Sequence, residues 1–135
     1  MVYCSMRDGK PKPVFWVGSA LADLKEFPKQ VRTDVGFALW VAQRGDRPAQ
    51  AKPLKGIVSG SGILELVERH DGDAYRVVYT VRYKEAVYVL HAFQKKSKRG
   101  VRTPKHEIDV IRERLRAAEE HNRGIEQGEE QDSGE

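Results

Sequence analysis

Three side chains on predicted strands, and a lysine-rich segment after the last of them, have the types needed to cleave a phosphodiester. Arg76, His91 and Glu65 supply a guanidinium, an imidazole and a carboxylate, and Lys95 and Lys96 begin the cationic segment. Metal-independent cleavage of RNA uses the ribose 2′-hydroxyl as nucleophile, so it requires a base, an acid and cations for the phosphorane. Imidazole or carboxylate can move protons, and guanidinium or ammonium groups can hold the oxyanions. These residue types therefore suit that reaction.

The side chains on the strands also have a purely structural interpretation. A histidine on a strand is more often packed or hydrogen-bonded than catalytic, and Glu65 can be a cross-strand ionic partner of Arg69 or Arg76. From the residues alone, the structural interpretation is favoured for both His91 and Glu65.

The segment 94–103, QKKSKRGVRT, contains five basic residues and no acidic one. These residues are Lys95, Lys96, Lys98, Arg99 and Arg102. Because the first four lie close together, they repel one another and gain nothing for folding. Phosphate binding therefore explains this segment better than a solvated turn does.

Length and charge limit the class of protein. A chain of 135 residues and 15.3 kDa is expected to form one domain. Residues 123–135 hold one basic and five acidic side chains, so a net charge of +4 for the whole chain becomes +8 for residues 1–122. A polyanionic partner and a well-solvated basic surface explain this surplus about equally well. The longest stretch without charged residues, 13–22, is about half of a membrane span. With no recognisable secretion signal, a cytoplasmic protein is expected.

Hydrolytic and metal-dependent mechanisms lack their motifs in this sequence. It contains no G-x-S-x-G, Walker loop or H-E-x-x-H. Its four histidines, His70, His91, His106 and His121, fall on different predicted elements, and Cys4 is its single cysteine. We therefore expect neither a metal site nor a cofactor.

A short strand and two helices are predicted in the first third of the chain. The β-branched and aromatic run 14–17 predicts a strand, and Ser19 is a suitable N-cap for the helix that follows. A second helix begins at Pro28 and ends at Gly45, so the two helices form a hairpin. The broken, basic segment 46–62 predicts a loop.

Three consecutive strands joined by tight turns follow this loop. The predicted strands are 63–69, 74–82 and 86–93, and the predicted two-residue loops are Gly72-Asp73 and Lys84-Glu85. The resulting cross-strand pairs are Glu65 with Thr80, Arg69 with Arg76, Val78 with His91, and Thr80 with Val89.

These pairings divide the strand residues between two faces of the sheet. Leu64, Leu66, Val77, Tyr79, Val81, Tyr88, Leu90 and Ala92 share an apolar face for helices to cover. Glu65, Arg69, Arg76, Thr80, Arg82 and His91 share the opposite face. Both pairings produce the same division, so the second face is the candidate working surface.

The remaining segments complete a single domain over residues 14–122. Pro104 begins a last helix with an apolar stripe that continues to about His121. Residues 1–13 lack periodicity and are predicted to form a flexible arm. The acidic residues 123–135 are predicted to form a disordered tail.

Four pieces of the sequence resemble one protein family. LEL, YRVVY, LHAFQKKSK and TPKHEI occur in this order between Gly62 and Ile108. Together they resemble the RelE-like superfamily of bacterial toxins, in its HigB-like, phage-related branch. The similarity continues through PLKGI and VFWVGSALADLKEFP, so it covers nearly all of residues 14–120. It implies an α+β fold in which an N-terminal strand and a helical hairpin pack on a mostly antiparallel sheet, followed by a C-terminal helix.

The resemblance also implies a function. It would make this chain the toxin of a type II toxin–antitoxin pair, a metal-independent endoribonuclease (mRNA interferase) that cuts messenger RNA in the ribosomal A site. The inhibiting partner would be a cognate antitoxin, often of the helix-turn-helix type. Two alternatives stay open: a gyrase-poisoning toxin of the same fold, as in the ParE branch, and a non-catalytic module that binds RNA or a partner.

Site residues follow from the resemblance position by position. The strand arginine of the family falls on Arg76, and its basic segment falls on Lys95 and Lys96, so these three residues would hold the scissile phosphate. His91, in the Leu-His motif, is the candidate for proton transfer. Glu65 would orient it or act as an alternative base.

Further cations are expected to bind RNA around this site. Some relatives carry lysines on the second strand where this chain has Glu65 and Val67, which shifts phosphate binding to other basic side chains. The expected RNA-binding residues are Lys52, Lys55, Arg69, Lys98, Arg99 and Arg102.

Overall fold

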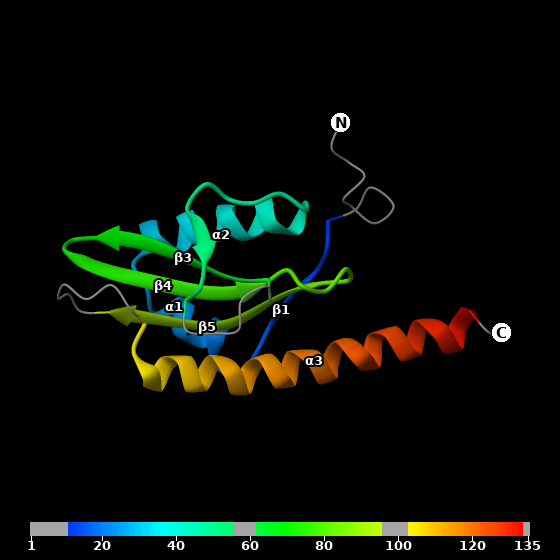
Figure 1. Cartoon of the computed structure of the whole chain (residues 1–135). Helices are drawn as coiled ribbons and strands as arrows, with labels where there is room; N and C mark the ends of the chain where they lie inside the picture. Colours follow the sequence, from blue (N-terminus) through cyan, green and yellow to red (C-terminus); the bar gives the residue numbers. More distant parts are fainter. Residues whose placement is uncertain (1–10, 56–61, 96–102, 134–135) are drawn as a thin grey trace.

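A five-stranded sheet with helices on both faces organises the chain (Figure 1). The computed structural model describes residues 11–55, 62–95 and 103–133. In chain order, its elements are β1 (Val14–Trp16), α1 (Ala20–Lys25), α2 (Lys29–Gln43), β2 (Ala51–Pro53), β3 (Ile63–His70), β4 (Asp73–Thr80), β5 (Val87–Lys95) and α3 (Lys105–Ser133). The strand order is β1-β5-β4-β3-β2, with β1 parallel to β5 and the other neighbours antiparallel. The predicted α+β fold is confirmed.

Helices α1 and α2 cover one face of the sheet. The buried residues of α2 are Val31, Val35, Ala38, Leu39 and Ala42, which recur at helical spacing. They pack with Leu66, Val77 and Tyr79 of β3 and β4. Because each fully buried valine or leucine contributes roughly 1.5–3 kcal/mol, this core holds the helical hairpin on the sheet.

Helix α3 covers the opposite face. Its Ile108 and Ile111 are buried in a second core with Tyr88, Leu90 and Phe93 of β5. The helix runs along the sheet and continues beyond it (Figure 1). Among the described residues, no helix is both long enough and apolar enough to cross a lipid bilayer.

The turn between β3 and β4 lies one residue earlier than predicted. Asp71 and Gly72 both have positive φ, 51° and 84°, as a type I′ turn requires, and Asp-Gly is a preferred pair for that turn. Arg69 therefore pairs with Ala74, and Glu65 pairs with Val78, rather than with Arg76 and Thr80. Each partner shifts by two residues, so the predicted faces of these two strands are unchanged.

A bulge in β5 overturns part of the predicted face assignment. Val78 pairs with His91 as predicted, but Tyr79 pairs with Val89, which leaves Leu90 as an extra residue. The extra residue reverses the alternation in the first half of β5. Tyr88 and Leu90 therefore face α3, and not the α1–α2 layer that contains Val77.

Two other segments differ from their predicted form. The three-residue strand β2 pairs with β3 inside the predicted loop 46–62. Lys12 and Pro13, at the end of the predicted flexible arm, are held by backbone hydrogen bonds to Gln43 (2.9 Å) and Val87 (3.0 Å).

Helix α3 does not end near His121 but continues to Ser133, through most of the predicted disordered tail. Two side-chain contacts between positions four residues apart bridge the predicted end. Arg123 Nη2 lies 3.1 Å from Glu119 Oε2, and Asn122 Nδ2 donates to Glu126 Oε2 at 3.2 Å. Such contacts stabilise an exposed helix.

Two of the buried tyrosines, Tyr79 and Tyr88, predict a loss of stability at high pH. Burial is the main factor that raises the pKa of both Tyr79 and Tyr88 from 10.0 to about 12. A group whose pKa is higher in the folded state contributes stability below its unfolded pKa and loses it as the pH rises through the folded value. We therefore expect stability to fall between pH 10 and pH 12, measured by urea unfolding. Tyr88→Phe should reduce this fall. If both phenols titrate near pH 10 in the folded protein, as seen by tyrosinate absorbance, the prediction is wrong.

Candidate active site

Three of the residues proposed for catalysis, Glu65, Arg76 and His91, lie on the face of the sheet that α3 covers. Register places Lys52 of β2, Glu65 of β3, Val78 of β4 and His91 of β5 in one row across the four strands. Arg76 lies in the next row, with Val67 and Phe93 as its neighbours. Strand geometry thus brings Glu65, Arg76 and His91 to one face, as predicted.

Arg76 and Glu65 form a buried ion pair. Their exposed fractions are 3% and 6%, and Arg76 Nη1 donates to Glu65 Oε1 at 2.7 Å. The pair is diagonal across β3 and β4, because Val67 and not Glu65 lies directly opposite Arg76. The interpretation of Glu65 as an ionic partner of Arg76 is confirmed. Since burying two charges is costly, removing either partner alone leaves the other unpaired in the core.

One donor of this arginine is unused. Among the described residues, Arg76 Nε is buried and has no hydrogen-bond partner. A buried donor without an acceptor is costly, so such groups are rare and often mark a functional position.

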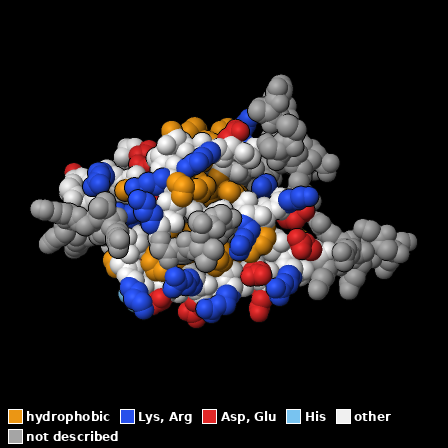
Figure 2. Space-filling view, in the orientation of Figure 1, with side chains coloured by type: hydrophobic (Ala, Val, Ile, Leu, Met, Phe, Trp, Pro, Cys, Tyr) orange, Lys and Arg blue, Asp and Glu red, His pale blue; other side chains and the backbone are white. Residues whose placement is uncertain are grey.

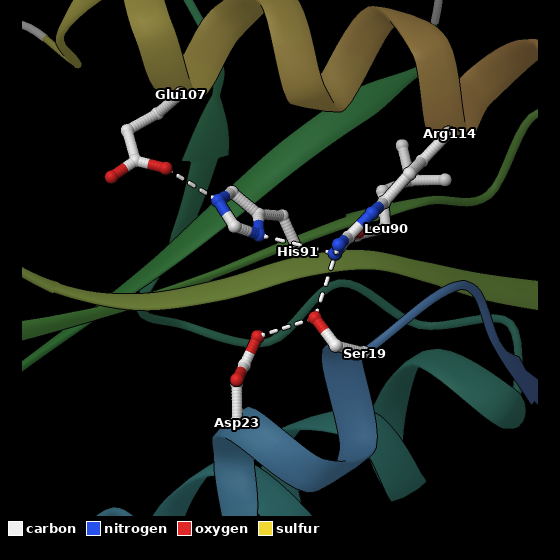
Figure 3. A network of polar contacts seen from close by, with 6 residues as sticks. All are labelled: Ser19, Asp23, Leu90, His91, Glu107 and Arg114. Atoms are coloured by element: carbon white, nitrogen blue, oxygen red, sulfur yellow. Dashed lines mark hydrogen bonds and ion pairs between the residues drawn. The ribbon is translucent and has the colours of Figure 1, made fainter.

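His91 is held between two residues of α3 (Figure 3). Its Nε2 lies 2.5 Å from Glu107 Oε1, and its Nδ1 lies 3.3 Å from Arg114 Nη1. A guanidinium can only donate, so Nδ1 is the acceptor and Nε2 carries the proton that it donates to Glu107. These two contacts fix the orientation of the imidazole ring.

Arg114 links this histidine to two other parts of the fold. Its Nη1 donates to the carbonyl of the bulged residue Leu90 at 3.1 Å, and its Nη2 donates to Ser19 Oγ at 3.0 Å. Ser19 Oγ in turn donates to Asp23 Oδ2 at 2.7 Å. The predicted N-cap residue of α1 therefore makes no side-chain cap bond and serves this network instead (Figure 3).

Gly18 makes room for the Arg114 side chain. It has a φ of +58°, and a Cβ built at this position would lie 2.7 Å from Arg114 Nε. Both the backbone conformation and the close approach therefore require glycine.

Phe93 connects the histidine network to the ion pair. Its ring stacks on that of His91, with the centroids 4.9 Å apart and the planes 26° apart, and it lies opposite Arg76 in the register. An imidazole, a guanidinium and two carboxylates are thus collected on the face under α3. Both nitrogens of His91 are already bonded, so the imidazole can take or give a proton only when one of these contacts is exchanged.

The other predicted site residues have different positions. Lys52, Lys55 and Arg69 are exposed. Lys95 is the last residue of β5 and pairs with Ala74. Lys96, Lys98, Arg99 and Arg102 lie outside the described residues. Lys and Arg side chains are spread over the face drawn in Figure 2, and several Asp and Glu side chains lie along its lower edge, where α3 runs.

Sequence reasoning missed the α3 side of the site. The carboxylate beside His91 is that of Glu107, while Glu65 is bonded to Arg76. Glu107 and Arg114 are seven residues apart with Ile111 between them, a spacing that places all three on one face of a helix. That spacing was the signal in the sequence that could have placed Glu107 and Arg114 on the helix face that packs on the sheet. Within the described ranges, no three His, Cys, Asp or Glu side chains are grouped so that they could hold a metal ion.

Comparison with known families and structures identifies the relatives of the chain. The model of a family described as "Phage derived protein Gp49-like (DUF891)" matches residues 22–116, well over half of the chain. The chain belongs to this Gp49-like family. A comparison with curated proteins finds no match. The matched range of this Gp49-like protein includes the ion pair and His91 with both of its α3 partners.

Two solved structures are similar to this Gp49-like protein. One is a mutant of the E. coli toxin RelE in the free state, with a TM-score of 0.51 and 16% identity over 80% of this chain and 98% of that one. The other is the toxin–antitoxin complex RelBE2 from Mycobacterium tuberculosis, with a TM-score of 0.44 and 19% identity over 64% of this chain and 94% of that one. The first shows that the chain has the predicted RelE-like fold.

Proposed function

We propose that this Gp49-like protein is the toxin of a type II toxin–antitoxin pair and cleaves messenger RNA on the ribosome in the cytoplasm. Its inhibitor would be a cognate antitoxin of the helix-turn-helix type. The observation that supports the cleavage proposal most strongly is the grouping of Arg76 and His91 on one face of two adjacent strands, the second of which ends at Lys95. The RelE-like fold supports the assignment to toxins.

In this proposal, Arg76 binds the scissile phosphate without leaving Glu65. The ion pair uses Nη1, while Nε is buried and unpartnered among the described residues. A phosphate oxygen is the charged acceptor that this donor lacks. Lys95 and Lys96 add positive charge for the phosphorane.

His91 transfers the proton in the same proposal. The 2′-hydroxyl of the ribose attacks the phosphorus, its proton passes to a base, and the departing 5′-oxygen receives a proton from an acid. A group of the substrate would replace Glu107 or Arg114 at one nitrogen of His91. The contact at the other nitrogen would keep the ring oriented. Lys52, Lys55, Arg69, Lys98, Arg99 and Arg102 would bind the flanking RNA through its phosphates.

Primer extension on a defined message after induced expression tests this function. We expect discrete cuts in translated messages, accompanied by growth arrest. Purified protein should cleave the same message only when ribosomes present it. Efficient cleavage of naked RNA would contradict the ribosomal model, and intact message with gyrase-linked DNA breaks would instead identify a gyrase poison.

One observation favours a second candidate, a non-catalytic module that binds RNA or a partner. Both nitrogens of His91 are occupied by protein side chains, and Arg76 is paired with Glu65. Growth arrest without any cut in a ribosome-bound message would support this candidate.

A further inference from the structure

Two large aromatic side chains are exposed on the outer face of α2. Phe37 is 63% exposed and Trp40 is 45% exposed, and within the described part of the chain they are the exposed large hydrophobic side chains. Their ring centroids are 5.8 Å apart, so they form one patch. This patch lies opposite the helix face that packs on the sheet. Exposed aromatic pairs of this kind are typical of protein–protein contact sites.

Basic residues lie on the same stripe of the helix. Lys29 precedes the aromatic pair by two turns, and Arg44 follows it by one turn. The guanidinium of Arg44 lies over the Trp40 ring, 4.7 Å from its centroid. The outward stripe, Lys29, Thr33, Gly36, Phe37, Trp40 and Arg44, contains no acidic residue, and Asp34, which lies beside it, accepts a hydrogen bond from Gln30 at 3.2 Å. It is therefore apolar in the middle and positive at both ends.

Gly36 leaves space beside the aromatic patch. It is exposed in the middle of α2, and a Cβ at this position would meet no atom within 4 Å. Glycine destabilises a helix interior relative to alanine, and here no internal packing requires it. A missing side chain next to Phe37 does, however, let the backbone of a partner approach closely.

We infer that the outward face of α2 binds an acidic amphipathic helix of a second protein. Apolar side chains of that helix would pack on Phe37 and Trp40, and its acidic residues would lie near Lys29 and Arg44. The inference does not depend on the nuclease proposal, because α2 packs on the face of the sheet opposite to Arg76 and His91. Both surfaces can be occupied at the same time.

Other occupants fit this surface less well. A second copy of the chain would place Lys29 and Arg44 against the same cations, whichever way the two helices ran. RNA would need open ring faces for base stacking, but Arg44 covers one face of Trp40. A membrane-surface helix needs a broad apolar face, whereas this stripe offers one aromatic pair.

The test uses the full chain and a synthetic helical peptide. The peptide carries leucines at helical spacing between glutamates, and a control peptide has lysines in place of the glutamates. Binding is followed by the NMR signal of the Trp40 indole. We expect the acidic peptide to shift this signal at low salt and to bind roughly tenfold or more tightly than the control peptide. Phe37→Ala with Trp40→Ala should weaken binding by a similar factor.

Two further variants separate binding from folding. Lys29→Glu should weaken binding of the acidic peptide. The matched change Lys105→Glu, at an exposed position of α3, should not. Gly36→Ala should raise the Tm and yet weaken binding, which a purely structural role of this residue would not produce. The inference is overturned if the two peptides bind equally, if the acidic peptide leaves Trp40 unshifted, or if the patch instead mediates dimerisation or binding to RNA or anionic vesicles.

Discussion

Replacing Glu65 by leucine and Arg76 by methionine together should leave the protein folded and abolish growth arrest. The two side chains form a buried pair at 2.7 Å, and buried ion pairs can often be exchanged for apolar residues of similar volume at little cost in stability. The double variant removes the guanidinium that the proposed mechanism needs for the phosphate. Arrest is measured after induced expression, and stability by urea unfolding.

The single variant Arg76→Ala cannot separate loss of the proposed phosphate contact from loss of folding. It leaves the carboxylate of Glu65 buried without its partner, at a cost of about 3–5 kcal/mol, so growth arrest would be lost through unfolding alone. Lys25→Met serves as the control, because it removes an exposed positive charge far from the pair in sequence. A folded Glu65→Leu/Arg76→Met protein that still arrests growth would show that the guanidinium is not needed.

Gly18→Ala should destabilise the protein far more than Gly72→Ala, although both glycines have positive φ. At Gly72 (φ +84°) a Cβ meets nothing within 4 Å, so the cost is the conformational one of about 1–2 kcal/mol. At Gly18 (φ +58°) a Cβ would also lie 2.7 Å from Arg114 Nε, so the arginine must move away. Its partly buried hydrogen bond to Leu90 would then be lost, at about 1.5–3 kcal/mol for a bond to a charged group, together with its exposed and weaker bond to Ser19.

Urea unfolding of both single variants measures this difference. A double-mutant cycle with Arg114→Ala identifies its origin, because Gly18→Ala should cost no more than Gly72→Ala once the arginine is absent. If Gly18→Ala and Gly72→Ala destabilise the protein equally while Arg114 is still present, the steric explanation is ruled out. The NMR signals of the His91 ring should also change in Gly18→Ala, because Arg114 is the residue that contacts Nδ1.

The strand assignment from the sequence succeeded where a local pattern determines the structure. Alternation of apolar and polar residues predicted the faces of β3 and β4, and the two-residue shift of their register preserved them. The pairing of Val78 with His91 was also predicted correctly. The sequence offered two ionic partners for Glu65, Arg69 and Arg76, and the structure shows the pair with Arg76.

Features that depend on long-range packing were not predictable in this way. The bulge at Leu90 adds one residue to a strand without changing its composition, so a two-residue period cannot reveal it. The strand β2 is three residues long and is defined by its neighbour β3. The bonds from Glu107 and Arg114 to His91 join α3 to β5, 16 and 23 residues apart, and only the folded chain brings them together.

The bulge in β5 also affects how this strand can change during evolution. Tyr88 and Leu90 belong to the core under α3, while Val87 and Val89 belong to the core under α1 and α2. Deleting one codon at Leu90 would restore regular alternation without changing the partners of its neighbours, because Tyr79 already pairs with Val89 and Val78 with His91. The deletion would, however, remove the Leu90 side chain from the core under α3, together with the carbonyl that anchors Arg114. Substitutions along β5 are therefore far more accessible to this protein than any change in the length of the strand.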